Sequence, residues 1–280
     1  MKKLNEMQIH LIDYLSDGMC HSGNELGEQF NVSRTAIWKH IKQLVDIGLP
    51  IQRIPHRGYR LTCPLKLLSE PSICEQLNAK HFNKRIHFHL FASLHSTNRL
   101  LRELPRTDGI DICCAETQTE GRGRFGRHWY SPFGENIYCS SRWHFDCDLS
   151  RLSGLSLVVS LAILAMLNDV GIKEHICVKW PNDILWHDKK LCGNLIEVVA
   201  ESNGSAEVVI GIGLNVNSSS LYKTENNQAS LPDKAWCSLY DITGDYLDRN
   251  MLIAGLITSL NQYLDDFIQH GFASFITRWH

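Results

Sequence analysis

The sequence lacks a long uninterrupted hydrophobic run and any evident export signal. Its longest apolar stretch, residues 154–170, contains two serines, an asparagine and an aspartate, and it is too short to cross a bilayer comfortably. The basic residues 2 and 3 are followed by Asn5, Glu6 and Gln8, where a signal peptide needs an apolar core. We therefore expect a cytoplasmic chain that does not enter a membrane, with residues 154–170 as a buried helix.

Cysteine pairs at metal or redox spacing and a strong net charge are also missing. The ten cysteines include no C-x-x-C pair, and the histidines form no metal pattern with them, so we expect reduced thiols and no metal site in the protein. The formal charge is only -2, so any nucleic-acid contact must come from a local basic face. No G-x-x-x-x-G-K-[ST] motif occurs, which excludes a P-loop.

What is present begins with a small module in residues 1–63. Apolar residues recur at helical spacing in residues 7–15, a capping box opens a second helix at Ser22, and Ser33 can cap a longer third helix. Two short alternating runs follow, residues 49–54 and 59–61, joined by a basic turn. This order predicts a winged helix-turn-helix, in which the third helix enters the DNA major groove and the wing reaches the backbone.

The third helix and the wing carry most of the basic residues of this module. The residues expected to contact DNA are Ser33, Arg34, Thr35, Trp38, Lys39, Lys42 and Arg57. A three-helix packing module with a solvated basic face is the alternative. We favour DNA binding because cap, turn, helix and wing all agree.

Beyond a proline-bounded linker at residues 64–71, strand and helix patterns alternate through residues 72–280. The expected strands are residues 85–92, 111–118, 136–143, 176–180, 190–199 and 207–215, and the expected helices are residues 97–104, 152–170 and 250–271. Mixed strands with helices on one side favour an α+β fold over a doubly wound sheet.

Residues 121–129, GRGRFGRHW, are the most informative stretch. Three glycines allow main-chain amides to approach a ligand closely, and three arginines suit carboxylate or phosphate oxygens. The stretch does not continue into a helix, as a dinucleotide fingerprint should. The pattern favours an anion site, although a flexible basic surface loop remains the alternative.

Two further motifs could contribute to the same pocket. Residues 179–183, KWPND, and residues 188–193, DKKLCG, could aim an amide, a carboxylate and an ammonium group together; a plain β-turn followed by a solvated strand lysine is the alternative. Residues 210–217, IGIGLNVN, place two glycines in a strand, which indicates close approach of a ligand or a bulge.

In this order the motifs resemble the signature segments of bacterial biotin–protein ligases, and Ser96, Thr97, Asn98 and Gln118 resemble that family's remaining biotin-pocket residues. Residues 32–41 resemble the DNA-binding module of the bifunctional members, which also repress the biotin operon. The resemblance covers nearly the whole chain. It implies a class II synthetase-like mixed-sheet catalytic domain behind the winged helix-turn-helix.

The resemblance also implies a reaction and its residues. Biotin and ATP, with Mg²⁺, form biotinoyl-5′-AMP and pyrophosphate, and a lysine of biotin carboxyl carrier protein then attacks the adenylate. The biotin contacts carried over are Ser96, Thr97, Asn98, Gln118, Gly121, Arg122, Gly123, Arg124, Trp129, Lys190, Gly211 and Gly213. Those for ATP or adenylate are Arg122, Arg124, Arg127, Trp129, Asn182, Lys190 and Asn215. The expected catalytic residues are Lys190, Arg124 and Asp183, of which Asp183 is our own candidate for accepting a proton from the acceptor lysine.

Three further expectations concern the oligomeric state on DNA, the C-terminal domain and the alternative functions. Adenylate binding is expected to order residues 121–129 and 218–231 and to promote a homodimer on an inverted-repeat operator. The family's usual C-terminal β-barrel is absent after the last helix, and Phe125 replaces a basic residue seen in some relatives. The alternatives are a biotin- or adenylate-sensing repressor with impaired transfer, and a ligase for a related acid such as lipoate, against which residues 96–98, 121–129 and 179–183 argue.

Overall fold

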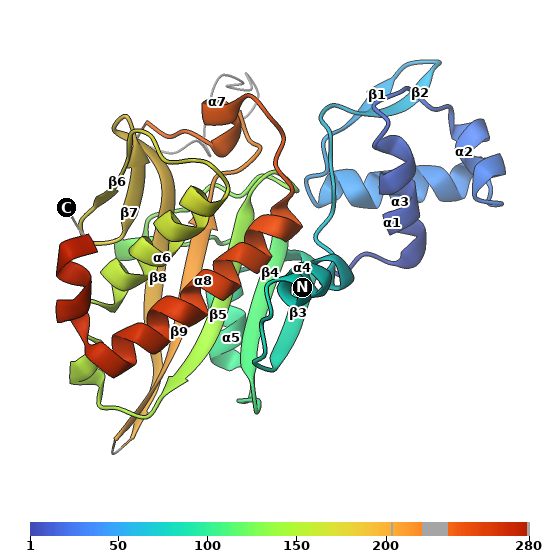
Figure 1. Ribbon diagram of the computed structural model, residues 1–280. Coiled ribbons are helices and arrows are strands. Elements are labelled where there is room, and N and C mark those ends of the chain that lie inside the picture. Colours follow the sequence, from blue (N-terminus) through green and yellow to red (C-terminus); the bar gives the residue numbers. More distant parts are fainter. Residues whose placement is uncertain (203, 220–234, 279–280) are drawn as a thin grey trace.

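The computed structural model describes residues 1–202, 204–219 and 235–278. A small N-terminal domain lies beside a larger domain built on one sheet (Figure 1). The two parts match the expected winged helix-turn-helix and mixed-sheet domain. No helix among the described residues is long and apolar enough to span a membrane.

The N-terminal domain consists of three helices and a two-stranded wing. Its elements are α1 (Glu6–Leu15), α2 (Gly23–Gln29), α3 (Arg34–Asp46), β1 (Ile51–Ile54) and β2 (Gly58–Leu61). Asn5 and Ser22 form capping boxes at α1 and α2, and the Ser33 side chain caps α3, so that each helix begins where its free amides find a side-chain acceptor. The apolar faces of the three helices meet in one core.

A seven-stranded sheet forms the larger domain. Its strand order is β3 (Ile86–Leu94), β4 (Ile110–Gln118), β5 (Ile137–Phe145), β9 (Ser205–Leu214), β8 (Lys189–Ser202), β7 (Asp183–Trp186) and β6 (Ile176–Lys179). Strands β3 and β4 are parallel and every other neighbouring pair is antiparallel. The sheet is therefore mixed, as expected, and the sequence pattern missed only the four-residue β7.

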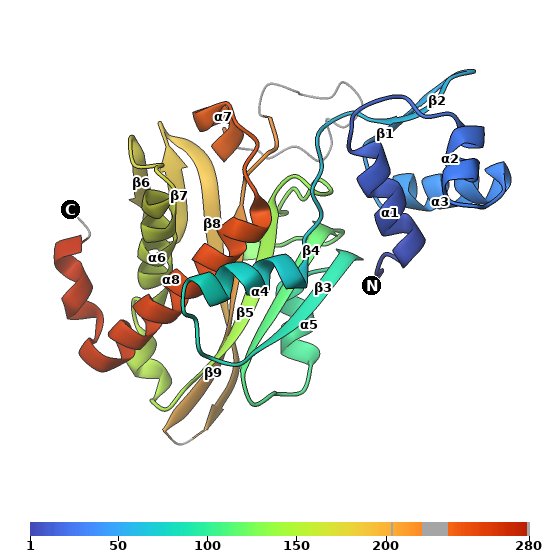
Figure 2. The same cartoon turned by 45° about the vertical axis from the view of Figure 1, so that its right-hand side comes forward.

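Three helices cover one face of this sheet: α4 (Glu70–Ala79), α6 (Leu155–Asp169) and α8 (Arg249–His270) (Figure 2). The helix expected over residues 250–271 is α8, which buries an apolar stripe of Leu252, Leu256, Leu260, Leu264 and Phe267, and α6 is the buried core helix predicted for residues 154–170. The expectation of helices on one side alone was wrong. Helix α5 (Thr97–Glu103) packs on the other face against β4, β5 and β9, where Leu100 and Leu101 join a buried apolar cluster with residues of the sheet.

Shorter elements among the described residues are α7 (Leu239–Thr243) and the 3-10 segments Arg124–Gly126, Leu149–Leu152 and Phe272–Arg278. Helix α4 was not predicted. Its first residues, Glu70 and Pro71, belong to the stretch taken as linker, and Ser69 caps it.

The connection between the domains is fastened by buried polar groups. Arg249 donates to Glu116 at 2.7 Å and to the Lys66 carbonyl at 2.7 Å, and the other Glu116 oxygen accepts from the Leu68 amide at 2.6 Å. Phe133 of the larger domain is 3% exposed and packs into the core of the N-terminal domain. The domains thus share an apolar contact as well as a held linker.

Candidate functional site

A pocket of about 560 Å³ opens at the ends of β8 and β9 and is walled by α5, the 121–129 loop and the β6–β7 turn. Nearly all the ligand contacts expected from the sequence line it: Ser96, Thr97, Asn98, Gln118, Arg122, Gly123, Arg124, Arg127, Trp129, Asn182, Asp183, Lys190, Gly211, Gly213 and Asn215. Segments up to 119 residues apart therefore converge on one cavity. That convergence was the main expectation from the ordered motifs.

The first turn of α5 forms one wall. The Thr97 amide and hydroxyl both donate to Gln118 Oε1, at 2.8 and 3.1 Å. The Ser140 hydroxyl lies 2.6 Å from both Thr97 Oγ1 and Asn98 Oδ1, and Ser140 itself is fully buried. These contacts fix the side chains of Thr97 and Asn98 before any ligand arrives.

Asn98 is held from the opposite side by β8. Its Nδ2 donates to the Leu195 carbonyl at 3.2 Å and to Glu197 Oε2 at 2.9 Å. The other oxygen of Glu197 accepts from Arg102 at 2.8 Å and lies 3.8 Å from an Arg122 nitrogen. Glu197 thus connects α5 to the arginine loop.

The 121–129 loop is pinned by backbone hydrogen bonds at its base, between Gly123 N and Arg127 O at 2.7 Å and between Trp129 N and Gly121 O at 2.8 Å. Phe125 at its tip adopts φ 57°, is 86% exposed and lies against the Arg124 guanidinium. Arg124 also donates to Asn182 Oδ1 at 3.3 Å. The arginine side chains are thereby presented along the pocket mouth on a closed loop.

Lys190 of β8 is one of the cations that line the pocket. Its Nζ lies 2.6 Å from Asp183 Oδ1 and 5.2 Å from the centre of the Trp129 ring. The lysine–aspartate contact has the distance of an ion pair but not the geometry of a hydrogen bond, since Oδ1 has no hydrogen-bond partner. This ammonium group lines the pocket, so it can also face a bound anion.

Hydrogen bonds between Asn182 and Asn194 join the turn between β6 and β7 to strand β8. Asn182 Nδ2 donates to the Asn194 carbonyl at 2.7 Å, while the Asn194 amide donates back to the Asn182 carbonyl at 3.1 Å. Ser156, at the start of α6, donates to Asn194 Oδ1 at 2.8 Å. The network aims Asn182 at the pocket from a fixed backbone.

Two glycines of β9 form the back wall, where a side chain has no room. A Cβ at Gly211 would lie 2.0 Å from Asn98 Oδ1, and one at Gly213 would lie 2.4 Å from Trp129 Cε2. Trp129 Nε1 is buried without a hydrogen-bond partner in the described part of the chain. Glycine at these two positions therefore keeps the cavity open.

Gly121 does not line the pocket. It is buried, and a Cβ there would lie 2.7 Å from the Trp129 carbonyl oxygen, so its role in the structure is to allow the loop to close. The Asn215 amide donates to the Cys237 carbonyl at 2.9 Å and so supports the segment that carries Trp236. The contacts assigned from sequence remain predictions as ligand roles.

Five residues that line the pocket lie outside the motifs singled out in the sequence: Tyr130, Asn136, Asn194, Leu195 and Trp236. Asn136 accepts from the Val216 amide and the Ser218 hydroxyl, at 2.8 and 2.9 Å. Isolated asparagines give no local pattern; only the position of Asn194 directly after Gly193 could have suggested it.

Within the described residues no group of three or more His, Cys, Asp or Glu side chains could hold a metal ion. Of the segment expected to order on ligand binding, residues 218–231, the part from 220 onward lies outside the described residues.

The surface of α3 carries the residues expected to contact DNA. Arg34, Thr35, Trp38, Lys39 and Lys42 are exposed, and the Lys42 ammonium lies over the Trp38 ring at 5.6 Å. Arg57 is exposed at the wing tip. The Ser33 hydroxyl accepts from the Ala36 amide at 3.2 Å and so serves as the helix cap.

Comparison with known proteins gives the same two parts. The model of the biotin/lipoate A/B protein ligase family matches residues 90–215, and a helix-turn-helix domain model matches residues 6–60. The chain is 37% identical over 278 residues to the bifunctional ligase/repressor BirA of Escherichia coli (strain K12), covering 99% of this chain and 82% of the relative. For BirA of Bacillus subtilis (strain 168) the identity is 32%, covering 92% and 78%.

Among solved structures, the biotin protein ligase of Aquifex aeolicus in complex with biotin and ATP matches with a TM-score of 0.56 and 28% identity. The match covers 69% of this chain and 76% of that one.

Proposed function

Because the chain belongs to the family of bifunctional biotin ligase/repressors, we propose that it activates biotin with ATP, transfers biotin to a lysine of biotin carboxyl carrier protein, and represses transcription from operator DNA. The observation that carries the ligase proposal is the convergence of the α5 start, the arginine loop, Lys190 and the two glycines of β9 on one pocket. A winged helix-turn-helix with an exposed basic α3 supports the repressor proposal.

The fit of biotin rests on prearranged polar groups. Thr97, Asn98 and Gln118 present fixed donors and acceptors that suit the ureido ring, and Trp129 forms an apolar wall beside Gly213. A buried polar site of this kind discriminates strongly, because a ligand that lacks matching groups leaves protein groups unpaired. The pocket is also in the size range of small-molecule sites.

In the first step the biotin carboxylate attacks the α-phosphorus of ATP. The bond from that phosphorus to the bridging oxygen breaks, and pyrophosphate leaves with its electron pair, which yields biotinoyl-5′-AMP. We assign Lys190 to the carboxylate and then to the acyl phosphate oxygen, and Arg122 and Arg127 to phosphates. On binding, the Lys190 ammonium would exchange the Asp183 carboxylate, which lies 2.6 Å away, for the ligand.

In the second step the acceptor lysine attacks the acyl carbon and AMP leaves. A lysine with a pKa of about 10.4 is charged at neutral pH, so its amine must lose a proton first. We assign Asp183 as the acceptor of that proton, since its carboxylate lies at the pocket and is released when Lys190 moves to the adenylate. Arg124 keeps the adenylate in place and shielded from water.

Mg²⁺ enters this proposal with ATP. Magnesium commonly binds substrate phosphates with few protein ligands and keeps several waters, so a site without a dedicated metal cage fits it. Its contribution is to neutralise the leaving pyrophosphate.

Incubation with labelled biotin, Mg·ATP and a biotin acceptor domain tests the ligase proposal. We expect a labelled acceptor, and we expect Lys190→Met to lose the labelling while Lys189→Met, an exposed neighbour, keeps it. Absence of labelling by the unaltered chain at every enzyme concentration would contradict the proposed activity.

Two variants test the assigned roles. Asp183→Asn should transfer biotin from preformed adenylate more slowly than the parent chain, whereas Asp188→Asn, on the exposed β7–β8 turn, should transfer it at the parental rate. A normal rate for Asp183→Asn would exclude Asp183 as the proton acceptor. Arg124→Gly should release adenylate faster than the parent chain, and unchanged retention would exclude its role.

For repression we propose that adenylate promotes a homodimer that binds an inverted-repeat operator. Sedimentation with and without adenylate checks this. We expect a larger sedimentation coefficient with adenylate, and equal coefficients would refute the dimer.

A further inference from the structure

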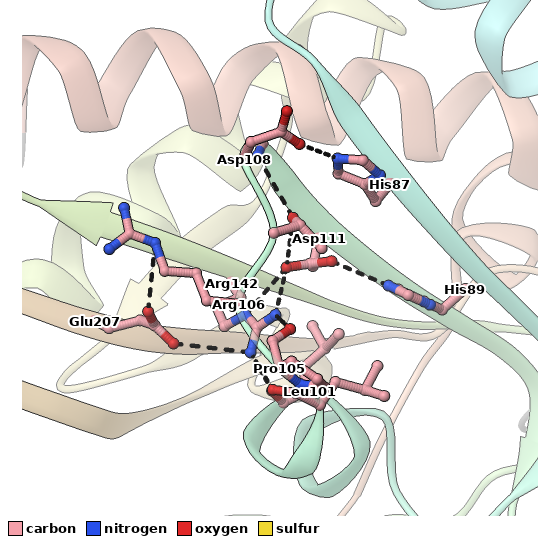
Figure 3. Close-up of polar contacts among 12 residues, drawn as sticks. His87, His89, Leu101, Pro105, Arg106, Asp108, Asp111, Arg142 and Glu207 are labelled. Atoms are coloured by element: carbon pink, nitrogen blue, oxygen red, sulfur yellow. Dashed lines mark hydrogen bonds and ion pairs between the residues drawn. The ribbon is translucent and has the colours of Figure 1, made fainter.

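Arg142 is a buried cation on β5, two residues beyond Ser140 and therefore on the same face of the strand. Its side chain is 4% exposed, and it points at the end of α5 (Figure 3). Nη1 donates to the carbonyls of Leu101 at 3.0 Å and Leu104 at 2.7 Å, and Nη2 donates to the Pro105 carbonyl at 2.6 Å. The guanidinium group thus serves three backbone acceptors at one helix end.

Helix α5 needs such a partner. The last carbonyls of a helix have no partner within it, and the negative end of the helix dipole favours a cation. With seven residues α5 is about two turns long, which is too short to be stable without tertiary contacts. Arg142 is therefore its C-terminal cap.

The opposite end of α5 carries the expected biotin contacts. Ser96 caps it, and the Ser140 hydroxyl lies 2.6 Å from both Thr97 Oγ1 and Asn98 Oδ1. Strand β5 consequently holds α5 at both ends, through Ser140 at the first turn and Arg142 at the last. A helix fixed at both ends cannot tilt or slide without breaking buried hydrogen bonds.

Asp111 of β4 fixes the guanidinium itself. Its Oδ2 accepts from Arg142 Nε at 3.1 Å and from Nη2 at 2.5 Å, and His89 Nε2 lies 3.1 Å from Oδ1. Burial opposes ionisation of Asp111, but the hydrogen bonds from Arg142 and His89 outweigh it and hold its pKa below the usual value. A buried ion pair is weak as a source of stability, yet it fixes orientation, which is the property that α5 requires.

We propose that Arg142 is a positioning residue of the biotin site: by capping α5 against β5 it holds Thr97 and Asn98 in register with Gln118 and the glycines of β9. This inference rests on the proposed function. It does not make Arg142 a catalytic residue, since its contacts are with the helix end and not with the pocket.

The test compares Arg142→Gln with Arg106→Gln. Arg106 belongs to the same polar cluster, but its side chain is 56% exposed, and its ion pair within the described residues is a long one, to Glu207 at 3.9 Å. We expect Arg142→Gln to raise the KM for biotin about ten- to a hundredfold, as small misplacements of binding groups do, with the KM for ATP nearly unchanged. Arg106→Gln should leave both KM values near those of the parent chain.

Hydrogen exchange of the backbone amides in residues 97–103 gives a second readout that needs no activity. We expect faster exchange in ligand-free Arg142→Gln and no change in Arg106→Gln. A residue that only stabilised the fold would lower the active fraction and hence kcat, without separating the two KM values.

Arg142→Lys covers the case in which Arg142→Gln does not fold. Lysine keeps the charge opposite Asp111 but has three donors from one nitrogen, and it cannot serve all the carbonyls and the carboxylate in the geometry of a guanidinium group. We expect an intermediate rise in the biotin KM and intermediate exchange. A folded Arg142→Gln or Arg142→Lys with a parental biotin KM and parental exchange in residues 97–103 would overturn the inference.

Failure of the proposed function has a different signature. In that case the unaltered chain itself neither binds biotin nor labels an acceptor, while the exchange of α5 still reports whether Arg142 holds the helix.

Discussion

Gly213→Ala tests the back wall of the pocket with a single methyl group. Gly213 lies in β9 between β5 and β8, and a Cβ there would lie 2.4, 2.6 and 2.8 Å from Cε2, Cζ2 and Nε1 of Trp129. The conflict is thus with three atoms of one indole ring rather than with the far end of a flexible side chain. The Trp129 ring lines the pocket, so the cavity is one direction in which it can move.

The expected magnitude follows from this overlap. Overpacking by a methyl group costs about 1–3 kcal/mol, and a displaced Trp129 can relieve that cost in the free protein by turning into the pocket. Biotin must then push the ring back, so its affinity should fall by about 5- to 150-fold, at about 1.4 kcal/mol per factor of ten. Thermal stability should change less than binding.

Calorimetric titration with biotin measures the effect, and thermal unfolding checks the fold. The matched control is Gly255→Ala in α8, where the new Cβ meets only the Met166 side chain, at 3.1 Å. A folded Gly213→Ala that binds biotin as tightly as Gly255→Ala would refute the steric reading of this wall.

Three further predictions concern pH, the domain contact and DNA. Burial raises the pKa of Glu135 to about 7, although the charge of Arg249 lowers it. The free energy of unfolding should therefore fall as pH rises from about 4.5 to about 7. In Glu135→Gln the difference between the unfolding free energies at pH 5 and pH 8 should be smaller than in the parent chain. Phe133→Ala leaves a cavity in the contact between the domains, typically costing 3–5 kcal/mol for buried phenylalanine, and should speed proteolysis in residues 64–69. Lys42→Gln should reduce the slope of log DNA affinity against log salt concentration by about one, because one fewer counterion is released, and it should leave sequence preference unchanged. An unchanged slope would exclude a phosphate contact of Lys42.

Elements with a strong period were predictable from the sequence. The apolar stripe of α8 and the largely apolar sequence of α6 gave both helices, and capping residues gave the starts of α2 and α3. Helix α4 was missed although Ser69 and Pro71 are ordinary helix-start residues. The reason is that Pro64 and Pro71, which bound residues 64–71, suggested a linker there.

The pocket was predictable where its residues stand in contiguous motifs, as in residues 121–129 and 179–183. Asn136 and Trp236 were not, because each is isolated in the sequence. Asn136 is brought to the pocket by its place before β5, and Trp236 by its bridge to Lys190 of β8. Arg142 and Asp111, which pair in the structure, are 31 residues apart in the sequence and lie on neighbouring strands. Only the register of the sheet brings the two together, and no local pattern encodes that register.

Biotin-dependent release of pyrophosphate in a single turnover tests the central claim most directly, because it requires biotin and ATP to meet in this one pocket. With the chain in excess over labelled ATP, we predict release of pyrophosphate only when biotin is present, retention of the adenylate on the protein, and loss of both in Lys190→Met but not in Lys189→Met. Tight biotin binding without any biotin-dependent pyrophosphate would contradict the claim that this pocket activates biotin.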